Sequence, residues 1–278
     1  LDLTQVPPYA ILSHRWTDDE ITYKDFAKGR RKSSAGFRKI EQFCHWAGPP
    51  QRVQWIWVDT ACIDQRSSAE LSEAINSMYH WYREAAFCVA YLADITNFPT
   101  QEQLAESEWF ERGWTLQELL APDEVIFCSK TWREFGRKGR GQATISRITG
   151  IAPEYLHLPS TVKAANFAEI LSWAAGRKTS RAEDMAYCLL GLLDINMPLL
   201  YGEGGQKAFM RLQYLFIQQS ADESIFIFRD RDPPLNVTGM LAVEPAQFHH
   251  CISNDRSRRA LQRAPYYVTH KGLYIEGP

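Results

Sequence analysis

SEWFERGWTLQELLAP, residues 107–122, is the stretch around which the rest of the chain is organised. Ser107 is a residue type that caps helix N-termini, and Pro122 cannot continue a helix, so the stretch predicts one helix of about four turns. Phe110, Trp114 and Leu119 recur at helical spacing and predict an apolar face packed on a core. Gly113 costs about 1 kcal/mol inside a helix, which indicates a local bend or a close backbone approach.

Within this stretch, Trp114 and Glu118 are four residues apart and would share one helical face. A carboxylate next to a buried indole is a candidate for chemistry, because it loses hydration there. The same pattern also fits a half-buried helix in which Glu118 pairs with an arginine or caps a neighbouring helix. The spacing alone leaves both interpretations open.

Composition limits the function classes. The chain has 278 residues, of which 45% are hydrophobic and 13% aromatic, enough for one large domain or for a core with an appended subdomain. The net charge of −2 predicts no general attraction to nucleic acid or to an anionic membrane. Apolar runs such as Leu189–Leu193 are far shorter than the roughly 20 residues that cross a bilayer.

The six cysteines, which include Cys62, show no CxxC or CxxH spacing, so we expect free thiols in a reducing, cytoplasmic environment and no metal site. No signal peptide opens the chain, and we expect the sequence to be a piece of a longer protein.

Apolar runs alternate with helical patterns in the first half of the chain. This alternation predicts a mostly parallel sheet flanked by helices, an α/β fold. The strands are expected near 9–13, 54–59, 86–92 and 124–128. Helices are expected around 37–44 and over 69–83.

The second half has a more helical character. A capping box at Ser180–Glu183 predicts a helix through Leu193, and the glycine-rich segment 201–205 reads as a plain turn before a helix over 206–219. We expect a solvated loop at Gly136–Gly141 and a strand at Ser224–Phe228. The resulting domain prediction is an α/β core over 1–150, a helical extension over 151–232 packed on that core, and a β-rich tail over 233–278.

Polar and aromatic residues follow the first two predicted strands. Ligands of open α/β sheets bind beyond the carboxyl ends of strands, so these residues are candidates for ligand contact. They are Ser13, His14, Arg15, Trp16 and the polar run Thr17–Glu20 after the first strand, and Asp59 and Cys62 after the second.

Several long blocks resemble the fungal heterokaryon-incompatibility (HET) domain. The blocks are YAILSHRW (9–16), WIWVDTACIDQ (55–65), SEWFERGWTLQELLAP (107–122), EDMAYCLLGLLDINMPLLYGEGGQKAFMRLQ (183–213) and DESIFIF (222–228). This resemblance implies a cell-death effector, often joined to a nucleotide-sensing oligomerisation module.

The first half is also similar to TIR domains, and this resemblance implies a flavodoxin-like sheet. TIR domains carry a Ser-aromatic-Arg segment, for which Ser13-His14-Arg15 stands here, with His14 in place of the aromatic residue. They also carry a Ser…Trp-Cys-x-x-Glu-Leu helix, matched by Ser107…Trp114-Thr115-Leu116-Gln117-Glu118-Leu119 with Thr115 in place of Cys. The loop at Cys62–Ser68 departs from the TIR pattern.

In catalytic TIR domains the matching glutamate serves in splitting NAD at the nicotinamide–ribose bond, which implies that role for Glu118. A carboxylate can stabilise or capture the ribosyl cation, and no metal or cofactor is required. Trp16 and Trp114 could stack on a flat ring, and Arg15 could bind the pyrophosphate or a ribose hydroxyl. Core packing for the two tryptophans and a structural salt bridge for Arg15 stay open as alternatives.

Two function classes follow from these observations. The first is an NAD glycohydrolase that acts when self-associated, with Glu118 catalytic and Ser13, His14, Arg15, Trp16, Asp59, Cys62 and Trp114 binding the substrate. The second is a non-catalytic signalling module that works by self-association, because many domains with this fold are only scaffolds.

Overall fold

The computed structural model describes residues 6–48, 53–229, 239–251, 266–269 and 272–274 of the chain. The chain divides into two compact units. Unit 1 comprises Leu1–Glu111 and Gln117–Pro159, and unit 2 comprises Arg112–Leu116 and Ser160–Pro278. The residues at the centre of the stretch 107–122 therefore belong to unit 2, whereas those on either side of them belong to unit 1.

Unit 1 contains a five-stranded sheet in the order β2-β1-β3-β4-β5. The pairs β1–β2, β1–β3 and β3–β4 are parallel, and β5 is antiparallel to β4. This is the flavodoxin-like strand order, and it confirms the predicted α/β fold with a mostly parallel sheet. The strands are β1 Tyr9–His14, β2 Trp55–Trp57, β3 Phe87–Leu92, β4 Val125–Ser129 and β5 Glu134–Arg137.

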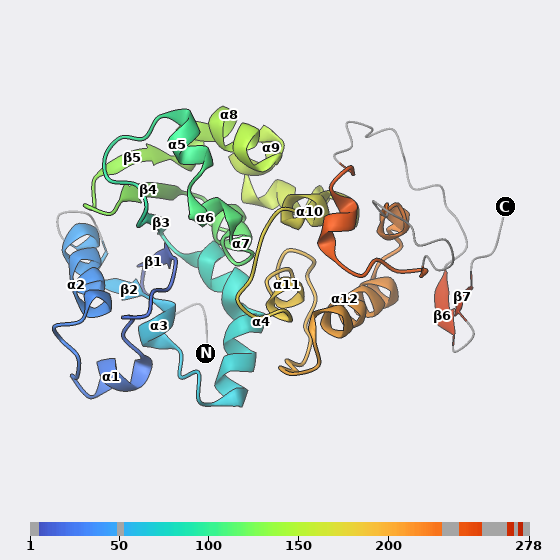
Figure 1. The fold of residues 1–278 in the computed structure, drawn as a ribbon, viewed down its shortest axis with the longest axis horizontal. Coiled ribbons are helices and arrows are strands. Elements are labelled where there is room, and N and C mark those ends of the chain that lie inside the picture. Colours follow the sequence, from blue (N-terminus) through green and yellow to red (C-terminus); the bar gives the residue numbers. More distant parts are fainter. Residues whose placement is uncertain (1–5, 49–52, 230–238, 252–265, 270–271, 275–278) are drawn as a thin grey trace. The chain divides into compact units, whose positions relative to one another are not determined.

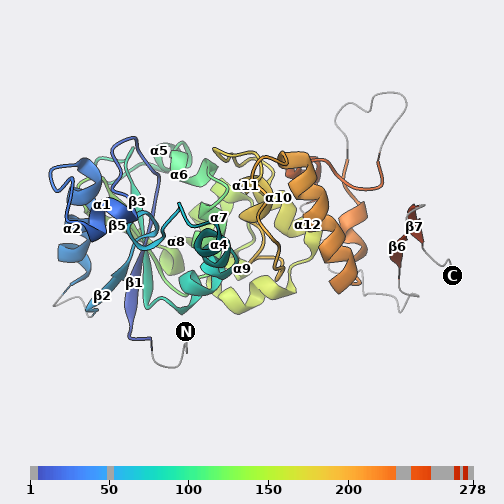
Figure 2. The same ribbon diagram turned by 90° about the horizontal axis from the view of Figure 1, so that it is seen from below.

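Helices cover both faces of this sheet. Figures 1 and 2 show α2 on one side of the strands and α4 and α7 on the other. The α2 side is a continuous apolar core, in which Ile40 and Phe43 pack against Leu12 of β1 and Val89 of β3. The helices of unit 1 are α1 Tyr23–Ala27, α2 Ala35–Ala47, α3 Asp59–Cys62, α4 Ser68–Glu84, α5 Gln101–Ala105, α6 Glu108–Glu111, α8 Lys138–Thr149 and α9 Pro153–His157; α7 Thr115–Leu120 lies partly in each unit.

The prediction of one continuous helix over 107–122 is wrong. The segment forms two short helices, α6 and α7, which are separated by Arg112, Gly113 and Trp114. The backbone N–H of Gly113 donates to the carbonyl of Lys178 at 2.8 Å instead of to a helical partner. The expected bend and close backbone approach at Gly113 are confirmed. Trp114 precedes α7, so Trp114 and Glu118 do not share the face of one helix.

Gly113→Ala is expected to destabilise unit 2 by about 1–3 kcal/mol, because a Cβ at this position would overpack the site. The added carbon would lie 2.6 Å from Cγ2 of Thr179 and 3.1 Å from the sulfur of Cys188. Urea denaturation measures the loss. Gly139→Ala in α8 is the matched control, since its Cβ would meet no atom within 4 Å. Equal stability of the two variants would contradict the close approach.

The expected solvated loop at Gly136–Gly141 is also wrong. Its residues belong to the end of β5 and the first turn of α8. The reason is Lys138, which is buried and whose ammonium group donates to the carbonyls of Leu119 and Pro122. These contacts satisfy carbonyl groups at the C-terminal end of α7, where a positive charge is favourable. Burial lowers the pKa of Lys138 to about 8.

Unit 2 is built mainly from helices, as predicted for the second half of the chain. The expected helix over 206–219 is confirmed as α12 Gly205–Gln219. The other elements are α10 Phe167–Ala174, α11 Asp184–Tyr187, the 3₁₀ helices Pro159–Ala164, Glu223–Phe226 and Pro245–Phe248, and a β-hairpin of β6 Tyr267–Thr269 and β7 Gly272–Tyr274. Most of the predicted tail over 233–278 lies outside the described residues.

Two local predictions fail in unit 2. The capping box at Ser180–Glu183 does not form, because the Glu183 carboxylate accepts the backbone N–H groups of Gly202 and Gly204, and only the short α11 follows. The expected strand at Ser224–Phe228 is replaced by a 3₁₀ helix, which Asp222 caps by accepting the N–H of Ser224. The predicted plain turn at 201–205 is confirmed, since a carboxylate of the chain itself takes up its N–H groups.

Candidate functional site

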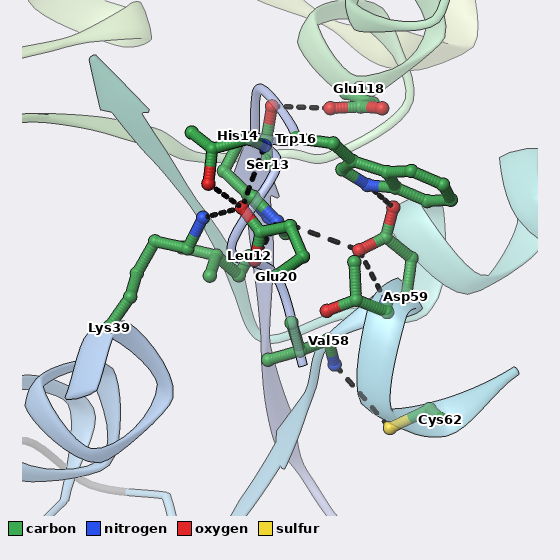
Figure 3. A network of polar contacts seen from close by, with 12 residues as sticks. Leu12, Ser13, His14, Trp16, Glu20, Lys39, Val58, Asp59, Cys62 and Glu118 are labelled. Atoms are coloured by element: carbon green, nitrogen blue, oxygen red, sulfur yellow. Dashed lines mark hydrogen bonds and ion pairs between the residues drawn. The ribbon is translucent and has the colours of Figure 1, made fainter. Parts of the chain in front are cut away.

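The carboxyl end of β1 is the centre of the candidate site. The order of connections reverses between β1 and its neighbours β2 and β3, and ligands of such sheets bind in the crevice beyond the strand ends at this point. Successive residues of a strand point to opposite faces, so the last two residues of β1, Ser13 and His14, begin two different networks. Figure 3 shows Ser13 directed toward Glu118 and His14 directed toward Asp59 and Glu20.

The first network holds Glu118. The Ser13 hydroxyl donates to the Glu118 carboxylate, although the two residues are 105 positions apart in the sequence. Ser13 in turn accepts the indole N–H of Trp109 at 2.8 Å. All three residues are buried, and Glu118 is only 7% exposed. Because Trp109 donates to Ser13 and Ser13 donates to Glu118, the direction of the Glu118 carboxylate is set before any ligand binds.

The Glu118 carboxylate influences two further buried groups. The Tyr82 hydroxyl, which donates to the carbonyl of Leu12 at 3.1 Å, has its pKa raised by burial and then by the negative charge of Glu118. Burial and the same charge also raise the pKa of the Cys88 thiol. Both groups therefore stay protonated around Glu118, and neither can serve as a competing anion.

The second network is centred on His14, whose side chain is fully buried between two carboxylates. Its Nε2 lies 3.7 Å from Glu20 and its Nδ1 lies 3.9 Å from Asp59. Neither ring nitrogen has a hydrogen-bond partner among the described residues. Lys39 of α2 also contacts Glu20 (Figure 3), so this carboxylate has an ammonium group and an imidazole ring as neighbours.

The pKa of the Glu20 carboxylate is lowered by these neighbours. Burial alone would raise it, but the interactions with His14 and Lys39 outweigh burial and lower the pKa from 4.5 to about 2. The charged carboxylate is therefore stabilised in the folded protein. Its contribution to stability is complete above pH 4.5 and is lost as the pH falls toward 2.

Glu20→Gln is expected to flatten the acid dependence of stability. The parent should lose about 3 kcal/mol more than the variant between pH 4.5 and pH 2, as an upper bound from the size of the pKa shift. Urea denaturation at pH 7, 4.5, 3 and about 2 measures the difference, and the other carboxylates cancel in the comparison. Parallel pH profiles for the two proteins would show that Glu20 is not stabilised in its charged form.

Asp59 links His14 to an exposed aromatic side chain. The indole N–H of Trp16 donates to Asp59 at 2.7 Å, and Trp16 remains 42% exposed. Asp59 also accepts the backbone N–H of Thr60 at 2.7 Å in the first turn of α3. Cys62 closes that turn by accepting the N–H of Val58 at 3.5 Å, and desolvation raises the pKa of its thiol.

Arg15 follows β1 directly and forms an ion pair with Glu108 of α6. Glu108 is itself anchored at the end of β3, because its backbone N–H donates to Asp94 at 2.8 Å and the hydroxyl of Ser107 donates to the same carboxylate at 2.9 Å. The structural salt bridge that the sequence allowed for Arg15 is therefore present. Both of its side chains are about half exposed to solvent.

Trp114 belongs to unit 2. Its indole N–H donates to Asp184 at 3.3 Å, and the hydroxyl of Tyr201 donates to the same carboxylate at 2.8 Å. Burial raises the pKa of Asp184, although these two hydrogen bonds act to lower it. Trp114 thus supports the packing of unit 2, in which it fixes the first residue of α11.

The structure brings Ser13 into contact with Glu118, and it links His14, Asp59 and Trp16 in one network. Sequence reasoning missed the partners Trp109, Glu108 and Lys39, and it included Glu20 only as a member of the polar run after the first strand. Glu108 and Trp109 lie within residues 107–122, so their position in the sequence could have identified them as candidates. Lys39 offered none, because only the folding of the segment after β1 brings it next to Glu20.

No group of three or more metal-ligating side chains occurs within the described ranges. Among the helices that the structure describes, none combines the length and apolar character needed to span a membrane.

Comparison with known proteins places these residues in a family context. Residues 9–98, which include both networks except Glu118 and Trp109, match the family model of the heterokaryon incompatibility protein (HET). The chain is 42% identical over 222 residues to vegetative incompatibility protein HET-E-1 of Podospora anserina. That alignment covers 75% of this chain but 16% of the relative, so the chain spans a small part of the protein that it resembles. No solved structure matches the chain.

Proposed function

The chain carries a heterokaryon incompatibility (HET) domain, and from this premise we propose that it is a cytoplasmic cell-death effector that hydrolyses NAD at the nicotinamide–ribose bond. The similarity to a vegetative incompatibility protein supports the cell-death part of the proposal. The hydrolytic part depends on one observation, the oriented and buried carboxylate of Glu118 at the carboxyl edge of the sheet. Self-association and an attached nucleotide-sensing module belong to the same proposal.

The chemistry assigns a role to Glu118. Cleavage of the bond to nicotinamide leaves a ribosyl centre with oxocarbenium character, and a carboxylate placed next to it stabilises or captures the developing charge. Nicotinamide leaves as a neutral ring, so no strong general acid is needed. The hydrogen bond from Ser13 holds the Glu118 carboxylate in place, so its negative charge has a fixed position in the proposed site. No metal or cofactor takes part in this scheme.

The remaining residues bind the substrate. Trp16 offers an exposed indole face, whose orientation Asp59 and His14 set, for stacking on a flat ring. Arg15 offers its guanidinium to the pyrophosphate, which it can bind in a bidentate manner. Cys62 lies at the end of α3, the helix that begins at Asp59.

A non-catalytic signalling module is the second candidate. The low exposure of Glu118 favours it, because a substrate reaches a buried carboxylate only if neighbouring side chains move. In that case the Ser13–Glu118 contact would be part of the core, and the domain would act by self-association alone.

An assay of nicotinamide release by the purified domain distinguishes the two candidates. It should be run at low and at high protein concentration and with the domain artificially clustered, because a site that needs self-association is silent in a dilute monomer. Release that increases with clustering is the expected result. No release from a folded, clustered domain would favour the signalling module.

A further inference from the structure

The Arg15–Glu108 ion pair bridges the ends of two adjacent strands. Arg15 follows β1, and Glu108 is tied to the end of β3 through Asp94. These strands pair directly, with His14 opposite Tyr91. The pair therefore lies where the strand order reverses, which is the place where sheets of this type bind ligands.

The ion pair is easily exchanged. The side chains of Arg15 and Glu108 are 52% and 55% exposed, and an ion pair in this setting contributes little to stability. The backbone of Glu108 is fixed by its hydrogen bond to Asp94, whereas its carboxylate has solvent as an alternative partner. An anion with two negative charges attracts a guanidinium more strongly than one carboxylate does, because its charge is larger.

We propose that Glu108 is a ligand-competing residue that occupies Arg15 in the free protein and is displaced by the pyrophosphate of a bound dinucleotide. The inference rests on the proposed function, because it takes NAD as that dinucleotide. Glu108 lowers the affinity for any anion that takes Arg15, because each such ligand must first displace the same ion pair.

Binding measurements in a Glu118→Gln background test this proposal without turnover. Isothermal titration with NAD, and with ADP-ribose as a ligand that lacks the scissile bond, gives the dissociation constants. Adding Glu108→Gln should lower both constants about two- to five-fold, which is the range of an exposed ion pair. The gain should shrink as salt is added, because salt screens exposed charges.

Two controls separate the contact from bulk charge. Glu106→Gln changes the net charge equally at an exposed position two residues away and should leave the constants unchanged. Arg15→Gln should weaken binding, and Glu108→Gln should have no further effect once Arg15 is absent, since the two residues act through one contact. Melting curves verify that these exposed substitutions leave the fold intact.

The outcomes distinguish the inference from the proposed function. If NAD binds but Glu108→Gln leaves its affinity unchanged, or if Glu106→Gln improves it equally, the competing role of Glu108 is overturned and the NAD site stands. If neither NAD nor ADP-ribose binds any folded variant, the NAD-binding function itself is overturned, and the inference falls with it.

Discussion

Glu118→Gln is expected to lower the rate of nicotinamide release by about 10²–10³, which is the typical effect of removing one preorganised electrostatic partner. Gln keeps the volume of the side chain and can still accept the hydrogen bond from Ser13. It cannot offer a full negative charge to the ribosyl cation. NAD binding should change little, because Arg15 and Trp16 supply the contacts proposed for binding.

The comparison needs matched conditions and a matched variant. Parent and variant should both be clustered, with nicotinamide release and thermal melting measured in parallel. Ser13→Ala keeps the Glu118 charge but removes the donor that orients it, so its rate should lie between those of the parent and Glu118→Gln. Expression of Glu118→Gln in cells should abolish toxicity if NAD loss is the cause of death.

Two results would contradict this mechanism. A Gln variant that melts like the parent and cleaves NAD within a few-fold of its rate would make Glu118 a structural residue. A clustered parent that releases no nicotinamide would leave the signalling function as the remaining candidate.

Trp109→Ala is expected to destabilise the protein by about 3–5 kcal/mol, the usual cost of removing a buried tryptophan. The indole is buried, and it meets the rings of Phe110 and Phe127 edge to face at 5.0 Å and 5.7 Å between centroids. It also donates to Ser13, so the substitution opens a cavity and removes the first donor of the relay that holds Glu118. Urea denaturation measures the loss of stability.

Two further variants separate packing from hydrogen bonding at Trp109. Trp109→Phe keeps most of the ring contacts and loses the N–H, so it should cost only about 1–3 kcal/mol. Trp55→Ala is the control, because Trp55 is 59% exposed and its removal should change stability by less than about 0.5 kcal/mol. If Trp109→Ala cost no more than Trp55→Ala, the relay would not be part of a packed core.

Much of the fold could be predicted because its signals are local. The apolar runs that became β1, β3 and β4 can be buried only as strands between helices, and their positions are confirmed within one or two residues. The helical spacing of 69–83 and 206–219 likewise predicted α4 and α12. The residues after β1 could be proposed as a site because parallel strands place their carboxyl ends at one edge of the sheet.

Other elements depended on contacts between distant residues. Local propensity favours a helix through Gly113, but the Lys178 carbonyl takes up its backbone N–H and ends α6 there. The segment around Lys138 has the composition of a loop, yet it starts α8 because the ammonium group is needed at the carbonyls of Leu119 and Pro122. No local pattern contains either partner.

The sequence by itself determined that this chain is an α/β protein with a parallel sheet, and it placed Ser13, His14 and Glu118 among the residues to examine. Only the tertiary structure decided that Ser13 donates to Glu118, that His14 lies between Glu20 and Asp59, and that Arg15 is paired with Glu108. The physical reason is the range of the interactions. Hydrophobic periodicity can be recognised within a few neighbouring residues. The hydrogen-bond partners of a buried polar group depend instead on how distant elements pack, and here they are up to 105 residues apart.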